Sequence, residues 1–379
     1  MPSLDRRSFL TGAAGAATAA GVAAVLPGTA AAQPVLGDTG STGLQGIEAP
    51  GLVGVTAPAG STDLGEVRFA LPGGWGEWTP FGTENHGRDA GAGLASAPVP
   101  TPDGAVGFEV RAPQGTQPVY ASTAGAQAPA PEGTEVQGMR QVPGVAQYAA
   151  LPVVDCYGIP VVPRWAWGCD ESISFGAIEY RPAQVLTVHH SVTPANWDPA
   201  STMRGFHRYH TLTNGWGDIG YQLVIDPSGQ VYQGHRTHSG YPVFAGPMPH
   251  GVRPDSVIGA HVAGTNSGNI GICLMGNFDQ GFPTPGAYGA LVNVLAKLCN
   301  ALSLDPFQGV NYWNPDGGWS RPAQAIQGHR DWMSTGCPGN SLHSTLPQVR
   351  QAVALAKNSG AMFPTSAGAP SVILPGSTG

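Results

Sequence analysis

Charged side chains are scarce in this sequence of 379 residues. Only 11% of the residues are Asp, Glu, Lys or Arg, and the formal net charge is -7. A surface that binds nucleic acid needs a basic patch, so this balance argues against a nucleic-acid partner. Long apolar runs are missing after residue 32, which argues against a transmembrane helix in the remaining chain. The 56 glycines and 36 prolines instead indicate a turn-rich, weakly helical protein.

The first 32 residues have the pattern of an export signal. Arg6 and Arg7 precede an Ala/Gly-rich, mildly apolar run, and small residues just before Gln33 offer a cleavage site. An ordinary secretory signal or a membrane anchor are the alternatives. The paired arginines favour the twin-arginine route, and the run is too short and alanine-rich for a good membrane span. We therefore expect residues 1–32 to be a twin-arginine export signal and the mature protein to be secreted.

Five cysteines are spread over the rest of the chain. They are Cys156, Cys169, Cys273, Cys299 and Cys337. In an exported protein an odd count leaves one thiol over when the others form disulfides. We expect Cys337 to be that thiol, while the other four can form two disulfides whose connectivity the sequence leaves open. The alternative is that Cys273 and Cys299 are buried thiols, because both lie on apolar faces.

Residues 33–120 have the pattern of a small β-rich module. Short β-prone pieces alternate with Gly, Pro, Ser and Asp turns, and no helical periodicity is present. Phe108 and Val110 alternate with polar neighbours, as in a half-buried strand. We expect a β-sandwich-like fold, followed by a Gly/Pro/Ala-rich linker at residues 121–155.

Three aromatic residues of this module allow two interpretations. Trp75, Trp78 and Tyr120 are candidates for a surface that stacks against sugar rings, or they belong to the hydrophobic core. Aromatic residues in small β-domains are more often core residues, so we predict the core position for all three.

From residue 156 the pattern changes to alternating strands and helices. Strands are expected at 183–190, 220–226, 230–234, 269–276 and 325–329, and helices from Asp198 onward, at 284–303 and at 346–357. The run 269–276 is apolar throughout, which predicts a central strand covered on both faces. Interleaved strands and helices indicate an α/β fold with one mixed sheet flanked by helices over residues 156–357. A disordered tail is expected at residues 358–379.

Two imidazoles and one thiol stand at or beyond the ends of predicted strands. His189 and His190 end one strand, His329 ends another, and Cys337 lies in the loop that follows. Adjacent strand residues point to opposite faces, so only one of His189 and His190 can reach a given ion. The face that His190 shares is the more apolar, which favours His189 as the ligand. Two imidazoles and one thiolate form the ligand set of a catalytic zinc that keeps a fourth position open for water.

Further motifs surround these residues. They are Arg164–Gly168, Val188–Ser191, Gly215–Tyr221, Gly229–Gly234, Gly259–His261, Asn266 with Asn269–Ile272, Gly276–Phe278 and His329–Gly339. Together, in this order and over roughly half of the chain, they resemble the type-2 zinc-dependent N-acetylmuramoyl-L-alanine amidases. That family shares a fold with animal peptidoglycan recognition proteins and T7-like phage lysozyme. The N-terminal region is similar to the β-rich module that precedes such domains in actinobacterial wall enzymes.

The resemblance implies a secreted or wall-associated hydrolase that cleaves peptidoglycan between N-acetylmuramic acid and L-alanine. It implies Zn²⁺ held by His189, His329 and Cys337, with Tyr221 as a catalytic residue. Thr335 occupies a position where relatives have Lys or Thr, and it can donate a hydrogen bond from the opposite loop. Binding-only relatives typically lack the ligand cysteine, so Cys337 favours hydrolysis over a non-catalytic peptidoglycan-binding module. His235 departs from the arginine that relatives often have there.

Three alternatives stay open at this stage. Asp218 and Asp331 are the nearest candidates for a general base, although both are more often structural. A closed structural zinc site would take His190 or Asp331 as a fourth ligand, and strand alternation argues against His190. The oligomeric state is not determined by the sequence, and a monomer is favoured.

Overall fold

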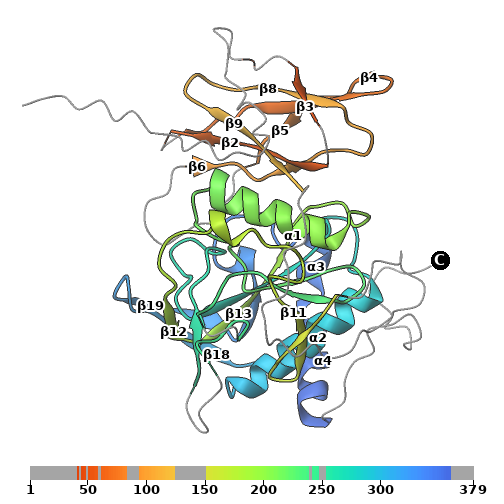
Figure 1. Cartoon of the computed structure of the whole chain (residues 1–379). Helices are drawn as coiled ribbons and strands as arrows, with labels where there is room; N and C mark the ends of the chain where they lie inside the picture. The colour runs from red at the N-terminus through yellow and green to blue at the C-terminus, as the bar shows by residue number, and fades with distance from the viewer. Residues whose placement is uncertain are drawn as a thin grey trace, which may run out of the picture. The chain divides into compact units, whose positions relative to one another are not determined.

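The computed structural model describes residues 41, 44–47, 50–58, 61–82, 94–123, 151–238, 241–246 and 253–359. The expected export signal, most of the expected linker and nearly all of the expected tail lie outside the described residues. Figure 1 shows short strands at the N-terminal end of the described chain and interleaved strands and helices after residue 150.

The N-terminal region consists of two antiparallel sheets. One contains β1 (Gln45–Gly46), β8 (Gly107–Arg111), β3 (Glu66–Leu71), β4 (Gly74–Trp75) and β5 (Thr79–Pro80). The other contains β6 (Leu94–Ala95), β2 (Gly51–Ala57), β7 (Val99–Pro100) and β9 (Gln117–Ser122). Val53 and Val55 of β2 pack in one cluster with Val67 of β3 and Phe108 of β8. Because one core takes side chains from both sheets, the predicted β-rich, sandwich-like arrangement is confirmed.

The prediction that Trp75 and Trp78 are core residues is wrong. Trp75 is 43% exposed, and Trp78 is only partly buried. Arg68 lies over both rings, at 4.4 Å from the Trp75 centroid and 4.6 Å from the Trp78 centroid. Long arginine side chains therefore cover these indoles in place of a hydrophobic core. Tyr120 does pack against the core, with its ring centroid 5.8 Å from that of Phe108.

The C-terminal region is built on a seven-stranded mixed sheet. Its order is β10 (Val154–Cys156), β11 (Ile159–Val162), β15 (Val231–Gln233), β14 (Leu223–Ile225), β17 (Asn269–Leu274), β13 (Val185–His190) and β20 (Ile326–Gly328). β13 is parallel to both of its neighbours, β17 and β20. Both β13 and β17 are buried along their whole length. The mixed central sheet and its apolar central strand are as predicted.

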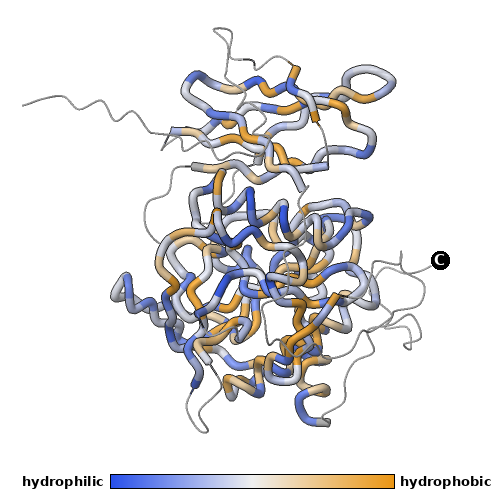
Figure 2. The backbone as a smooth tube through the Cα atoms, in the orientation of Figure 1, coloured by the Kyte–Doolittle hydropathy of each residue, from blue (hydrophilic) through white to orange (hydrophobic). Residues whose placement is uncertain are grey.

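Helices cover the two faces of this sheet. On one face, α2 (Pro285–Ala301) and α4 (Leu346–Ser359) share a core with strand residues such as Leu186 and Ile272. On the other face, α1 (Pro199–Arg208) packs with Val224 and Met275. In Figure 2 the hydrophobic stretches gather where the sheet and its helices meet. The alternation of the strands thus supplies one apolar side to each layer.

Helices α1 and α2 begin where their capping residues predict. The carboxylate of Asp198 accepts a hydrogen bond from the backbone N–H of Ser201 at 2.7 Å. The hydroxyl of Thr284 accepts one from the N–H of Ala287 at 3.1 Å. A proline follows each cap, where its missing N–H is not needed.

Several smaller elements were not expected from the sequence. They include the hairpin β18 (Gly309–Asn314) and β19 (Trp319–Gln324), the pair β12 (Tyr180–Pro182) and β16 (Asp255–Val257), the short helix α3 (Asn340–Ser344) and the single turns η1 (Glu171–Ile173), η2 (Tyr209–Thr213) and η3 (His329–Asp331). Within the described ranges, no helix combines the length and hydropathy that crossing a membrane requires.

The prediction of disulfides is wrong. All five cysteines are free and buried. Cys273 packs with the core on the α1 face of the sheet, whereas Cys299 packs with the core on the opposite face. Burial raises the pKa of Cys156 to about 12 and that of Cys299 to about 12. These thiols are therefore protonated core side chains, and for Cys273 and Cys299 the buried-thiol alternative is confirmed.

Candidate metal centre

Strand register brings His189 and His329 together. In the parallel pair β13 and β20, Val188 is the partner of Gly328. His189 follows Val188 in β13, and His329 follows Gly328 as the first residue of η3. Because the carboxyl ends of parallel strands lie at one edge of the sheet, the two imidazoles meet there, with ring centroids 4.7 Å apart.

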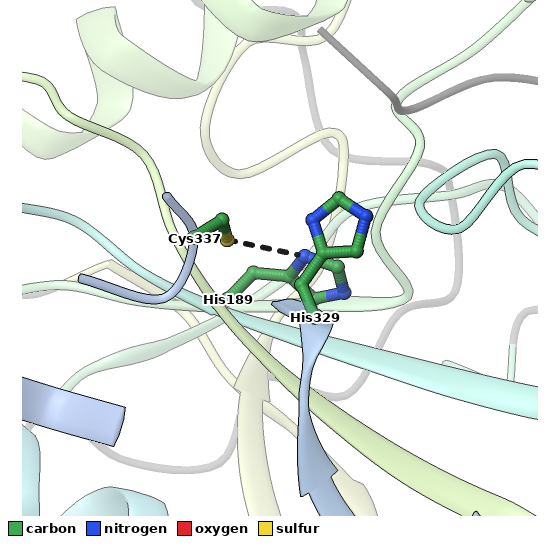
Figure 3. Close-up of side chains that lie close together, drawn as sticks. All are labelled: His189, His329 and Cys337. Carbon is green, nitrogen blue, oxygen red and sulfur yellow. Dashed lines mark hydrogen bonds between the residues drawn. The ribbon is translucent and has the colours of Figure 1, made fainter. Parts of the chain in front are cut away.

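A closed loop returns Cys337 to the same edge. The backbone N–H of Arg330 donates to the carbonyl oxygen of Cys337 at 3.0 Å. The Arg330 guanidinium also donates to the carbonyl of Gly336. These bonds tie the beginning of the loop to its end, so that the Cys337 side chain faces the histidines (Figure 3).

The three donor atoms fit a tetrahedral zinc ion. One ligand atom from each of His189, His329 and Cys337 lies within 4.8 Å of the others, and all three residues are buried. The Cys337 Sγ is 3.6 Å from the His189 Nδ1. Zinc bonds of about 2.05 Å to nitrogen and about 2.3 Å to sulfur, at a tetrahedral angle, predict a separation of about 3.6 Å. Both the donor chemistry and the spacing therefore suit zinc.

His190 lies on the other face of β13, as strand alternation predicts. Its Nδ1 accepts a hydrogen bond from the backbone N–H of Phe278 at 3.2 Å. Its own backbone N–H points toward the site, and it donates to the Cys337 Sγ at 3.4 Å. An amide donor next to sulfur favours the thiolate form, which is the form that binds metal. His190 thus supports Cys337 through its backbone, and its side chain is not part of the ligand group.

Tyr221 and Thr335 both lie next to the ligands. The Tyr221 ring is buried, with its centroid 5.2 Å from that of His189. The Thr335 hydroxyl accepts a hydrogen bond from the backbone N–H of Cys337 at 3.3 Å. The sequence therefore identified two polar side chains that adjoin the candidate metal ligands, and their catalytic roles stay predictions.

Asp331 stabilises the local structure of the loop. It accepts a hydrogen bond from the backbone N–H of Gly328 at 2.8 Å, and its other oxygen lies 2.8 Å from the Nε2 of His343. The carboxylate thus holds the turn that follows β20. This is the structural role expected for it.

Asp218 belongs to a buried ion pair. It is 1% exposed, and the Arg164 guanidinium donates to it at 2.9 Å. Burial opposes its charge, but Arg164 outweighs this and lowers the pKa of Asp218 to about 2. A carboxylate that is held ionised and bonded in this way is a poor general base.

His261, for which the sequence predicted no role, contacts His189 directly. Its ring is fully buried, and its Nδ1 lies 3.0 Å from the Nε2 of His189. Its position beside the motif that contains Asn266 and Asn269 was the one signal of its importance, because those residues hold it in place.

Comparisons with known proteins agree on this region. Residues 179–340 match the family described as N-acetylmuramoyl-L-alanine amidase. The human N-acetylmuramoyl-L-alanine amidase is 29% identical over 221 residues, which is 56% of this chain and 32% of that protein. The Drosophila melanogaster peptidoglycan-recognition protein LB is 29% identical over 169 residues, or 44% of this chain and 58% of the relative. The similarity thus spans about a third of the length of the human amidase.

Among solved structures, Drosophila PGRP-LB aligns with 48% of this chain and 90% of its own, at 27% sequence identity and a TM-score of 0.36. Peptidoglycan recognition protein 1 of Bos indicus is 29% identical over 198 residues, which is 51% of this chain and 85% of that protein. Similar proteins therefore carry both amidase and recognition-protein names.

Proposed function

Because residues 179–340 belong to the N-acetylmuramoyl-L-alanine amidase family, we propose that this protein is a zinc-dependent peptidoglycan hydrolase. It cleaves the amide between the lactyl group of N-acetylmuramic acid and L-alanine. The observation that carries the proposal is the convergence of His189, His329 and Cys337 at one edge of the sheet. Three protein ligands leave the fourth tetrahedral position for water or substrate, as in catalytic zinc sites.

His189, His329 and Cys337 would hold the ion through two imidazole nitrogens and one sulfur. The two neutral imidazoles and the single thiolate leave a bound Zn²⁺ with a net positive charge. When bound, zinc supplies a Lewis acid that polarises a carbonyl group and makes water nucleophilic near pH 7. The N–H of His190 donates a hydrogen bond to the Cys337 sulfur, and this bond would support the thiolate that holds the ion.

Tyr221 and Thr335 are the proposed catalytic side chains. Amide hydrolysis develops negative charge on the carbonyl oxygen, and a positioned hydroxyl donor stabilises it. The Tyr221 ring packs against His189, which would hold the ion. Thr335 lies two residues before Cys337 on the opposite loop. We propose that both hydroxyls donate to the reacting amide group.

The substrate also sets the place of action. Peptidoglycan lies outside the cytoplasmic membrane, and the paired arginines Arg6 and Arg7 favour export by the twin-arginine route. We therefore propose that the protein acts as a secreted or wall-associated enzyme.

The test is digestion of purified peptidoglycan, followed by mass spectrometry of the soluble products. We expect free stem peptides with an N-terminal L-alanine, their loss with a chelator, and their return when zinc is added. Cys337→Ser should release none, whereas Cys299→Ala, which removes a thiol from the far side of the sheet, should retain activity. If wild-type protein sediments with peptidoglycan but releases no peptide, hydrolysis is contradicted and the chain is a binding module.

A further inference from the structure

We propose that His261 is a positioning residue that fixes the metal-binding tautomer of His189. The inference rests on the proposed function only in that the ion is zinc. Its physical basis is a line of hydrogen bonds that begins at a backbone carbonyl and ends at the candidate ligand. His261 is not itself close enough to be a member of the ligand group formed by His189, His329 and Cys337.

The backbone carbonyl of Asn269 sets the tautomer of His261. Its oxygen lies 3.0 Å from the His261 Nε2. A carbonyl oxygen only accepts, so the Nε2 must carry the proton. A neutral imidazole has one donor and one acceptor nitrogen, which leaves the His261 Nδ1 as an acceptor.

The tautomer of His261 then sets that of His189. The His261 Nδ1 lies 3.0 Å from the His189 Nε2. With an acceptor on one side, the His189 Nε2 must donate and therefore carries the proton. The His189 Nδ1 is left with its lone pair, and this is the atom 3.6 Å from the Cys337 Sγ. The line of bonds thus presents the correct nitrogen to the metal before any metal binds.

The backbone around His261 holds its ring in this orientation. The N–H groups of His261 and Val262 both donate to the Oδ1 of Asn266, at 2.8 and 3.0 Å. The Asn269 side chain is fixed in turn, because its Nδ2 donates to the carbonyl of Thr265 at 3.0 Å. Asn266 therefore fixes the backbone from which the His261 ring extends. The side-chain bond of Asn269 fixes the residue whose carbonyl oxygen the ring contacts.

Close packing also restricts the position of the His261 ring. Gly271 of β17 lies beneath it, and a Cβ at that position would be 2.6 Å from the His261 Cγ. The two histidine rings meet edge to face, with an interplanar angle of 89° and centroids 5.0 Å apart. The usual partner of a ligand histidine is a carboxylate, a carbonyl or water. Here the partner of the ligand histidine is the neutral imidazole of His261, which adds no negative charge beside the ion.

The test compares zinc affinity in three variants of the full chain, by competition with a chromophoric chelator. His261→Leu removes the acceptor, and we expect zinc affinity to fall about 10- to 100-fold. His261→Asn places an amide oxygen near the position of Nδ1 and should recover most of the affinity. His207→Leu removes another buried histidine, away from the ligands, and should bind zinc as wild type does. Wild-type affinity in His261→Leu would overturn the proposal.

A second measurement needs no variant. In the metal-free wild-type protein, nitrogen-15 NMR of the imidazoles should show the Nε2–H tautomer for both His189 and His261. An Nδ1–H tautomer at either ring would refute the inference. Failure of the proposed function has a different result: the protein would then release no stem peptide from peptidoglycan, although wild type binds zinc and both rings show the Nε2–H tautomer. If His189→Ala binds zinc as tightly as wild type, zinc is not held at His189 and the inference is overturned.

Discussion

Val188 and Gly328 are register partners in the parallel strands β13 and β20, and a histidine follows each of them. The distance between the two candidate metal ligands is therefore set by backbone hydrogen bonding within the sheet. Cys337 reaches the same point through a loop closed on Arg330. Such a site is formed by the fold, and the metal needs to order little when it binds.

Zinc should stabilise the folded protein. A ligand that binds only the folded state raises the free energy of unfolding, by about 2.7 kcal/mol at a concentration 100 times its dissociation constant. We expect added zinc to raise the midpoint of thermal unfolding in wild type and in Cys299→Ala. The midpoint of Cys337→Ser should respond far less. An equal zinc response in Cys337→Ser would show that the ion binds elsewhere.

Gly271→Ala should weaken zinc binding although it removes no polar group. The added methyl would lie 2.6 Å from the His261 ring and displace it from His189. We expect a loss of zinc affinity of about 10- to 100-fold, as for other disturbed partners of ligand histidines. Gly309→Ala is the matched control, because a Cβ in that strand meets its nearest atom only at 3.9 Å. Equal zinc affinity in both variants would contradict the positioning role.

Local patterns predicted those parts of the structure that local chemistry decides. Asp198 and Thr284 cap helices because their side chains bond to N–H groups three residues away. Strand alternation separated His189 from His190 because adjacent side chains must point to opposite faces. The candidate metal ligands followed from this periodicity together with the resemblance to a known family.

Other features depended on contacts between distant segments. The role of His261 requires the carbonyl of Asn269 to lie beside its ring, which no spacing in the sequence reveals. Trp75 had the character of a core residue, but Arg68 from the neighbouring strand covers it. The disulfide prediction was based on the compartment, and it could not show that Cys273 and Cys299 lie on opposite faces of the sheet.

Tyr221→Phe should lower the catalytic rate and leave zinc affinity unchanged. The substitution removes one hydroxyl donor and keeps the ring that packs against His189. Loss of one donor to a developing oxyanion typically costs about 10²- to 10³-fold in kcat. The measurement is the release of stem peptides under saturating peptidoglycan, with zinc content determined in parallel. A variant with full activity would assign Tyr221 to packing alone.

Protein stability should fall as the pH falls from about 6.5 to about 4, in part because of His207. This side chain is buried next to Arg164, and burial first, with that positive charge second, lowers its pKa to about 4. Asp218 and Glu171 oppose the shift without cancelling it. The unfolded chain therefore takes up a proton in this pH range that the folded protein does not. Such a shift corresponds to at most about 3 kcal/mol of unfolding free energy.

The measurement is urea unfolding of the metal-free protein at several pH values between 7 and 4. His207→Gln cannot take up the proton, so the free energy of unfolding should depend less steeply on pH in this variant than in wild type. Some dependence should remain, because the pKa of the buried His235 is also lowered by burial. An unchanged slope in His207→Gln would mean that folding does not shift the pKa of this imidazole, which would contradict the prediction.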